Sequence, residues 1–275
     1  MSPDTTTPRT DGDDTGPVPA KAAASLQGRA VLVVGCRGRM GAMLCRRGTA
    51  AGLDMRGVDV PLTDAVLAPA CKDAALVLLC VPAAVFADVA TTVCAHLPAT
   101  AILADITSVK VRPLQQMEAI WPGPVVGTHP LFGPATPDED GLPVTVTPGR
   151  TAREEDTALV EAFFLALGCG TFRATADEHD RAMARVQNMN FITNLAYFAL
   201  LAGQEDLLPY ITPSFRRRLH AAEKMLTEDG TMFTGLFEAN PYSHEAVRQY
   251  RKMLNVAAAG DIELLCRRAQ WWWKK

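Results

Sequence analysis

A histidine motif and a glycine-rich loop are the features of this chain best suited to chemistry. His129 stands in the segment Thr128-His129-Pro130-Leu131-Phe132-Gly133-Pro134, which we expect to form a rigid turn. The glycine-rich loop lies earlier in the chain, at residues 35–41. A neutral imidazole is a good proton acceptor, and a glycine-rich loop between a strand and a helix is typical of dinucleotide sites. Together they predict a dehydrogenase with a histidine base.

The loop is expected to hold the cofactor's pyrophosphate. It follows the β-branched segment 30–34, typical of a buried parallel strand, and precedes helical sequence. Backbone N–H groups and the positive end of the helix then face one point. Cys36 stands where the usual fingerprint has its first glycine, and the glycine comes one residue earlier. The predicted cofactor contacts are Gly35, Cys36, Gly38, Arg39, Met40 and Gly41.

An acidic residue follows the second predicted strand, which ends at Val58. Asp59 lies about 20 residues past the loop, where the fingerprint places a carboxylate on the adenosine ribose hydroxyls. A carboxylate there repels a 2′-phosphate, so the sequence favours NAD over NADP. An ordinary strand-to-helix turn is the alternative for the loop taken alone.

Composition limits the classes of function. At 275 residues with 48% hydrophobic content, the chain can bury the core of two domains. Its net charge of −3 argues against nucleic acid as a main partner, and no apolar run of about 18 residues suggests a membrane span. The seven cysteines are scattered without a C-x-x-C pair, which predicts reduced thiols in a cytoplasmic protein and no metal site.

Sequence patterns divide the chain into three parts. Residues 1–27 have few large apolar side chains, which predicts a disordered leader that lacks the apolar region of a secretory signal. Strands alternate with helices over residues 28–176, as in a doubly wound, Rossmann-type dinucleotide-binding domain. Residues 177–275 predict an all-helical domain.

Polar groups follow the ends of the later predicted strands. Asp105 to Lys110 come after one strand, and His129 comes after the next. Ligands of open α/β sheets bind at the carboxyl ends of the strands, so these side chains should share a site. The predicted strands of this region are apolar runs at residues 75–81, 101–105, 124–127 and 144–147.

The order of the motifs resembles that of the prephenate and arogenate dehydrogenases of tyrosine biosynthesis. The motifs are G-x-x-G-x-x-G, the strand-end acid, L-C-V-P, D-I-T-S-V-K, H-P-L-F-G-P and E-H-D-R-A-M-A-R-V-Q. The resemblance runs from about residue 29 almost to the C-terminus. It implies a nucleotide-binding domain followed by a helical dimerisation domain, hence a homodimer. It also implies NAD-dependent oxidative decarboxylation of prephenate to 4-hydroxyphenylpyruvate.

The resemblance also implies roles for single residues. His129 would accept the hydroxyl proton as hydride leaves the substrate, and Ser108 would bind the same hydroxyl and orient the histidine. Val81 and Pro82 would lie against the cofactor. The alternatives are a histidine that only closes a turn and a serine that only caps a helix.

Two carboxylates of prephenate require cations at a fixed separation. Arg216, His220 and Lys224 share one face of a predicted helix. The family has arginine at the positions of both Arg216 and Lys224, and lysine lacks the bidentate fork, which puts affinity or substrate identity in doubt. Lys110 is expected near the cofactor or the substrate. The alternative for the basic face is plain solvation.

A further helix face is expected to line the substrate site. His179 and Asn190 share a face by helical spacing, with Gln187 nearby. His179 would contact the substrate's side-chain carboxylate, and Asn190 stands where the family often has a second histidine. The alternative for His179 is a role in capping the start of its helix.

Two other functions stay open at this stage. The chain could oxidise arogenate or another hydroxy acid, or it could be a non-catalytic, NAD-binding regulatory protein, as the departures at Cys36 and Lys224 allow. The C-terminal residues 271–273 are three successive tryptophans, which we expect to pack at a subunit boundary.

Overall fold

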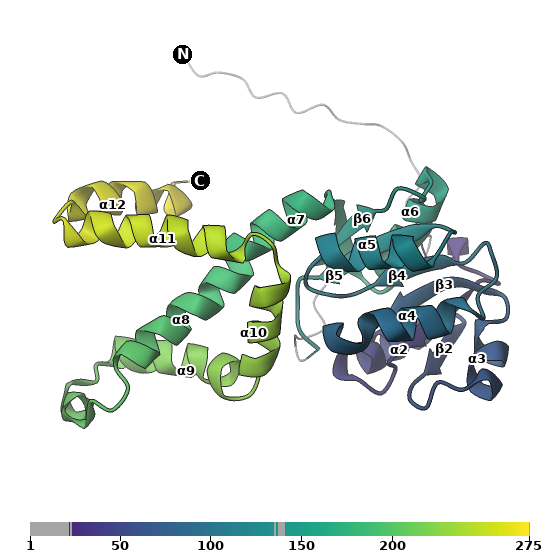
Figure 1. Cartoon of the computed structure of the whole chain (residues 1–275), viewed down its shortest axis with the longest axis horizontal. Coiled ribbons are helices and arrows are strands. Elements are labelled where there is room, and N and C mark those ends of the chain that lie inside the picture. Colours follow the sequence, from purple (N-terminus) through teal and green to yellow (C-terminus); the bar gives the residue numbers. More distant parts are fainter. Residues whose placement is uncertain (1–21, 23, 135, 137–140, 275) are drawn as a thin grey trace, which may run out of the picture.

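The computed structural model describes residues 22, 24–134, 136 and 141–274, and shows a sheet-containing part beside a helical part (Figure 1). Strands and helices alternate up to Arg173, and the described residues beyond it contain helices alone. The predicted fold class is therefore confirmed. In the portion of the chain covered by the structure, no helix is long and apolar enough to cross a membrane.

One seven-stranded sheet forms the first part, in the order β2-β1-β3-β4-β5-β6-β7. The strands β1 to β5 are parallel, β6 is antiparallel to β5, and β7 is parallel to β6. Their bounds are β1 Ala30–Val34, β2 Met55–Val58, β3 Ala74–Leu79, β4 Ile102–Asp105, β5 Val125–Pro130, β6 Leu142–Pro148 and β7 Cys169–Arg173. The sequence did not predict β7, because this edge strand buries only Cys169 and shows no apolar run.

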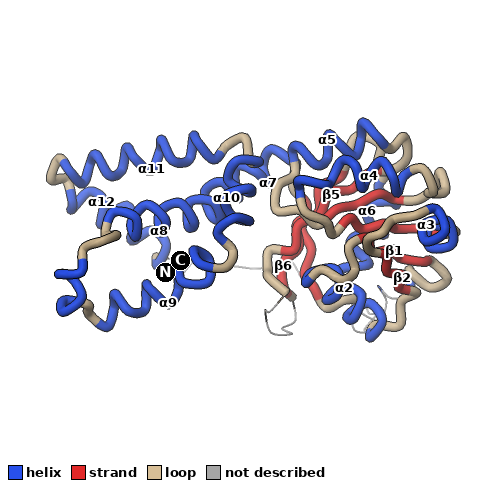
Figure 2. Tube along the Cα trace, turned by 60° about the horizontal axis from the view of Figure 1, so that its bottom comes forward, coloured by secondary structure: helices blue, strands red, loops and turns tan. Residues whose placement is uncertain are grey.

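Helices cover both faces of the sheet (Figure 2). α2 and α6 pack on one face, and α3, α4 and α5 pack on the other. Parallel strands covered on both sides consist of apolar residues throughout, which is why β1 and β3 were recognisable in the sequence. The bounds are α2 Arg39–Ala50, α3 Asp64–Cys71, η1 Ala83–Val85, α4 Phe86–Cys94, α5 Val111–Ile120 and α6 Glu154–Ala166.

The ordered fold starts earlier than the predicted leader boundary. Ala22 and Leu26, which fall inside the segment predicted to be disordered, are buried in the core beside α2 and α6. Their small and apolar side chains were too few to show as a pattern in the sequence. The rest of the predicted leader, residues 1–21 and 23, lies outside the described residues.

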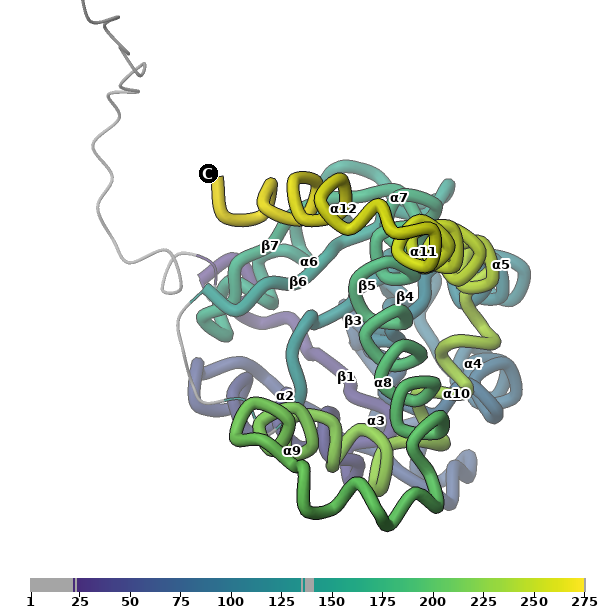
Figure 3. Tube along the Cα trace, turned by 90° about the vertical axis from the view of Figure 1, so that its left-hand side faces the viewer, coloured from purple at the N-terminus to yellow at the C-terminus, as the bar shows by residue number. Residues whose placement is uncertain are grey.

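A long, continuous helical segment, residues 176–200, leads from the sheet into the second part (Figures 1 and 3). We call this segment, made of α7, η2 and α8, the rod. It begins with a capping box in which Thr175 and Glu178 exchange side-chain and backbone hydrogen bonds. α11 and α12 lie on one side of the rod, and α9 and α10 lie on the other. The bounds are α7 Ala176–Met183, the π-helix η2 Ala184–Asn188, α8 Met189–Leu200, η3 Glu205–Tyr210, α9 Pro213–Thr227, α10 Gly230–Ala239, α11 Ser243–Ala258, α12 Ile262–Ala269 and η4 Gln270–Trp273.

Candidate functional site

The glycine-rich loop forms a tight turn that brings α2 against the end of β1. Gly35 has a left-handed backbone with φ of +87°, and a Cβ there would lie 2.5 Å from the Cys80 carbonyl oxygen. A Cβ on Gly41 would lie 2.3 Å from the carbonyl oxygen of Gly35. Gly38 is the N-cap of α2, and Arg39 and Met40 begin the helix. The loop therefore leaves the helix N-terminus open to an anion.

Cys36 fits the loop because another residue makes room for its side chain. A Cβ built on Gly57 of β2 would lie 2.8 Å from Cys36 Cβ and 3.0 Å from its Sγ. The thiol therefore occupies the space above β2 that a side chain at position 57 would need. Since Gly35 takes the left-handed conformation, the non-glycine residue after it carries no backbone strain.

Asp59 holds the loop against the end of β2. One carboxylate oxygen accepts the Arg37 N–H at 2.9 Å, and the other accepts the Val60 N–H at 2.8 Å. Each oxygen can accept a second hydrogen bond, so the carboxylate can still receive ribose hydroxyls. Val81 and Pro82 follow β3, and Val81 packs beside Gly35.

His129 lies in the last residues of β5, not in the turn that the sequence predicted. The pairing of β5 with β4 ends at Gly127, but β5 continues to pair with β6. In this antiparallel pair His129 lies opposite Thr145. Its Nδ1 lies 2.9 Å from Nε2 of His179, whose own Nδ1 lies 2.7 Å from an Asp180 carboxylate oxygen. The three side chains form a continuous hydrogen-bonded row that links β5 to α7.

Burial controls the charge of His129. His129 is only 4% exposed and His179 only 3%. Desolvation, aided by His179 and Lys110, holds the pKa of His129 well below its ordinary value. A neutral ring is therefore the resting form of His129 at neutral pH.

Lys110 is wholly buried, and its expected place near the cofactor or the substrate stays a prediction. Its ammonium lies 2.5 Å from both an Asp105 carboxylate oxygen and the Thr128 carbonyl oxygen. Desolvation lowers the pKa of Lys110, and the carboxylates of Asp105 and Asp180 oppose that shift. The lysine therefore ties the end of β4 to the residue that precedes His129.

Asp180 joins the two parts of the protein. Its carboxylate accepts the backbone N–H of Lys110 at 2.7 Å and that of Val111 at 2.9 Å, at the start of α5. The first N–H groups of a helix have no partner within the helix, so a carboxylate from α7 is well placed there. Asn240 donates to the Asp180 backbone carbonyl at 2.8 Å. Sequence reasoning missed Asp105 and Asp180 as site residues, although both lie inside motifs that it used.

His179 is not free to bind the substrate's side-chain carboxylate, contrary to what the sequence predicted. Both of its ring nitrogens are occupied, by His129 and Asp180, so neither is left for a substrate carboxylate. The burial that makes this possible comes from the packing of α7 against α5, which no local pattern reveals. Ser108 is half-buried in the loop between β4 and α5, two residues before Lys110.

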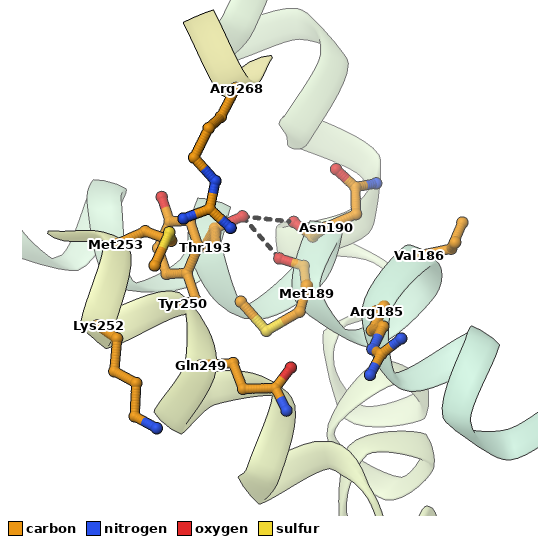
Figure 4. A pocket seen from close by; sticks show the side chains of 10 residues that line it. All are labelled: Arg185, Val186, Met189, Asn190, Thr193, Gln249, Tyr250, Lys252, Met253 and Arg268. Carbon is orange, nitrogen blue, oxygen red and sulfur yellow. Dashed lines mark hydrogen bonds between the residues drawn. The ribbon is translucent and has the colours of Figure 1, made fainter. Parts of the chain in front are cut away.

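Asn190 and His179 do not share a face, because the π-helix separates them. Wider π turns between α7 and α8 rotate the following residues away from their α-helical positions. Asn190 instead lines a groove of about 710 Å³ between α8, α11 and α12, with Tyr250 and Arg268 (Figure 4). Gln187 is half-buried within the π-helix. No cofactor or catalytic candidate is among the described residues that line this groove.

The basic face of α9 is exposed, and one of its cations reaches toward the nucleotide loop. Lys224 Nζ lies 3.4 Å from one Asp229 oxygen, and the other oxygen lies 3.3 Å from the Arg39 guanidinium. His220 lies 3.7 Å from Glu223. Arg216 is exposed near the start of α9. Lys224 and Arg39 therefore lie on either side of one carboxylate, although they belong to different parts of the protein.

Sequence comparisons find relatives of this chain. The family model for the prephenate dehydrogenase nucleotide-binding domain matches residues 48–170. The T-protein of Enterobacter agglomerans is 28% identical over 238 residues, which cover 84% of this chain and 62% of that protein. This chain therefore spans less than two thirds of that relative's length. The cyclohexadienyl dehydrogenase of Zymomonas mobilis is 26% identical over 71% of this chain and 72% of its own length.

The fold agrees as well. A crystal structure of prephenate dehydrogenase from A. aeolicus, in complex with hydroxyphenyl propionate and NAD+, matches with a TM-score of 0.71 at 21% identity. The match covers 90% of this chain and 93% of that chain. These similarities confirm the resemblance that the motifs indicated.

Proposed function

Because this chain carries the nucleotide-binding domain and the fold of the prephenate and arogenate dehydrogenases, we propose that it catalyses the NAD-dependent oxidative decarboxylation of prephenate to 4-hydroxyphenylpyruvate. The observation that carries the proposal is the placement of His129. It is a buried histidine at the carboxyl edge of a parallel sheet whose first strand ends in a dinucleotide turn. A site for hydride removal needs a base at this edge.

The residues around the glycine loop fit a dinucleotide. Side chains at Gly35 and Gly41 would clash with the protein's own backbone, so these glycines keep the turn tight, and we propose that a pyrophosphate binds at the start of α2 beside Gly38. We propose that Asp59 accepts ribose hydroxyls, since each of its oxygens accepts one backbone N–H, and that its charge disfavours a 2′-phosphate. Bound NAD supplies the acceptor for the hydride that the substrate loses. Val81 borders the same loop, and we propose that Val81 and Pro82 lie against the cofactor.

His129 is the proton acceptor of the proposed reaction. Positive charge builds on the carbinol carbon as hydride leaves, so the substrate hydroxyl must give up its proton. The Nδ1 atom of His129 is already hydrogen-bonded to His179, which leaves Nε2 to receive that proton. Burial keeps the ring neutral and therefore able to accept it. Ser108 is proposed to hold the same hydroxyl from the loop before α5.

Exposed cations on α9 are proposed to bind the substrate carboxylates. Lys224 faces the nucleotide loop across Asp229, and Arg216 lies about two helical turns away along α9. A lysine makes a weaker and less directional contact than the bidentate fork of arginine. The site is therefore also compatible with arogenate or another hydroxy acid, and these are the alternatives to prephenate.

A homodimer formed through the helical part is the proposed assembly. Large apolar side chains are exposed on α8, α11, α12 and the C-terminal turn: Leu195, Leu200, Tyr250, Leu254, Ile262, Trp271, Trp272 and Trp273. Exposed apolar side chains of this number indicate a protein interface. Sedimentation equilibrium should give twice the mass of the chain, and a monomer at micromolar concentration would contradict the proposal.

The free cysteines suit the reducing cytoplasm, where we place the enzyme.

The decisive experiment follows NADH absorbance when purified protein meets NAD and prephenate. A His129→Asn variant tests the base, and a His96→Asn variant is the matched control, because His96 pairs with Asp64 outside the proposed site. We expect turnover in the parent and the control. The His129 variant should lose about 10²–10⁴-fold in kcat, the usual contribution of a general base.

Other outcomes select the alternatives. Turnover with arogenate but not with prephenate would reassign the substrate. NAD binding without turnover of either would favour the non-catalytic regulatory protein. Full activity in the His129 variant would refute histidine as the base.

A further inference from the structure

We propose that Asp180 and His179 are positioning residues that fix the tautomer of His129, so that its proton sits on Nδ1 and Nε2 is left as the acceptor. The use of Nε2 in catalysis rests on the proposed function, whereas the tautomer itself follows from hydrogen bonding alone. The row of three side chains runs from the first turn of α5, through α7, to the end of β5.

The direction of the row is set by Asp180. Its Oδ1 accepts the Lys110 N–H and its Oδ2 accepts the Val111 N–H, so both oxygens already act as acceptors. Two backbone N–H donors at the positive end of α5 are the partners that a carboxylate without a proton takes. An ionised carboxylate has no proton to donate. The 2.7 Å contact between Asp180 Oδ1 and His179 Nδ1 therefore requires the proton to be on His179 Nδ1.

The position of the proton on His179 in turn determines the position of the proton on His129. A neutral imidazole carries one proton, so a His179 protonated at Nδ1 has a lone pair on Nε2. That nitrogen lies 2.9 Å from His129 Nδ1, which must then donate. The proton of a neutral His129 is thereby assigned to Nδ1, and its Nε2 is unprotonated.

The tautomer of His129 depends on the charge of His179. We take the ring of His179 as neutral, because its side chain is only 1% exposed and the Asp180 carboxylate beside it already accepts two backbone N–H groups. The buried Lys110 ammonium is bound to Asp105, and its positive charge disfavours another cation nearby. A cationic His179 would donate from Nε2 to His129 Nδ1, and the His129 proton would then move to Nε2. The two states of His179 thus give opposite predictions for the acceptor atom.

The row also has a consequence for the proton that His129 receives. When the substrate hydroxyl transfers its proton to Nε2, His129 becomes an imidazolium that still donates from Nδ1 to His179. The positive charge then lies two hydrogen bonds from the Asp180 carboxylate, in a buried site where such stabilisation is strong. Loss of His179 should therefore lower kcat more than it changes KM.

Nitrogen NMR of the imidazole rings tests the tautomer directly. The chain has five histidines, so a ¹⁵N-labelled sample gives few signals, and His129→Asn assigns the critical pair. His179→Phe keeps a ring of similar shape but removes the acceptor. His179→Gln retains an oxygen that can accept from His129 Nδ1. His96→Phe removes a different histidine–aspartate pair and serves as the control. Should His179→Phe fail to fold, Asp180→Asn removes the directing charge instead.

We expect His129 to carry its proton on Nδ1 in the parent, the control and the His179→Gln variant, and to lose that preference in His179→Phe. In the activity assay, His179→Phe should lower kcat by about 10²–10⁴-fold, as loss of an orienting acid does in a catalytic triad, with His179→Gln less affected. A proton on Nε2 of His129 in the parent, a doubly protonated His179, or an unchanged tautomer in His179→Phe would overturn the proposal. The spectra decide this even if prephenate is not the substrate.

Discussion

At the scale of single residues, burial sets the charge of the proposed base. Because desolvation lowers the pKa of His129 well below about 6.5, its ordinary value, the neutral ring persists into mildly acidic solution. We predict that kcat/KM stays constant as the pH falls to 6.5 and declines only below it, since protonation removes the acceptor. The pH profile of NADH formation checks this, and a decline that begins above pH 7 would contradict it.

The same shift affects stability. Between the lowered folded-state pKa and the unfolded value of about 6.5, the unfolded chain binds the proton that native His129 does not. Stability conferred by this residue is therefore fully present above pH 6.5 and is lost as the pH falls toward the folded-state pKa. Denaturant unfolding of the parent and of His129→Asn should diverge in this window and run parallel above it.

The loop cysteine depends on a glycine in the next strand. Gly57→Ala should destabilise the protein by about 1–3 kcal/mol, the usual cost of overpacking, because its methyl group would overlap Cys36. Cys36→Gly removes the obstruction, so the double variant should recover most of the loss. A double-mutant cycle on unfolding free energy and NAD affinity measures the coupling. Additive effects would show that the two residues do not share this space.

At the scale of elements, a buried ion pair holds the base in place. Lys110 binds the Asp105 carboxylate at the end of β4 and the Thr128 carbonyl of β5 beside His129, and both charged groups of the ion pair are inaccessible to water. Lys110→Met should cost about 3–5 kcal/mol of unfolding free energy, because the Asp105 charge would stay buried without its cation. Adding Asp105→Asn should restore part of the stability. Chemical denaturation compares the variants, and a Lys110→Met protein as stable as the parent would contradict this role.

The sequence predicted elements better than it predicted their faces. β1 and β3 were recognisable because strands buried on both sides are apolar throughout. The prediction that His179 and Asn190 share a helix face was wrong, because the π-helix η2 interrupts the α-helical repeat between them. The amino-acid sequence of this segment shows no pattern that indicates a π-helix. The resulting rotation of α8 relative to α7 could therefore not be predicted from residue spacing.

At the scale of the whole molecule, one carboxylate links the two parts across the proposed site. Asp229 binds Lys224 of α9 and Arg39 of the nucleotide loop, and both cations are largely exposed. Because both cations lie largely in water, each ion pair should contribute only about 1 kcal/mol or less, so Asp229→Asn should change stability little even though the Asp229 side chain is only 14% exposed. It should, however, free Lys224 for a substrate carboxylate and lower KM by roughly two- to fivefold, the affinity equivalent of that energy.

Steady-state kinetics at low and high salt test this link. Glu228→Gln is the matched control, because it removes a neighbouring charge outside the two ion pairs. The effect of Asp229→Asn should shrink at high salt, which screens exposed charges. An equal effect of both variants would attribute the change to net charge alone.

The sequence by itself determined what depends on neighbours along the chain. The dinucleotide turn needs glycines at fixed spacing, the buried strands need apolar runs, and the acid after β2 needs only its distance from the loop. Tertiary structure alone decided which side chains meet. The partner of His129 lies 50 residues away, and Asp180 reaches the start of α5 from 70 residues away. Such contacts depend on how α7 packs against the sheet and on how much water this packing excludes, and neither quantity is encoded in local spacing.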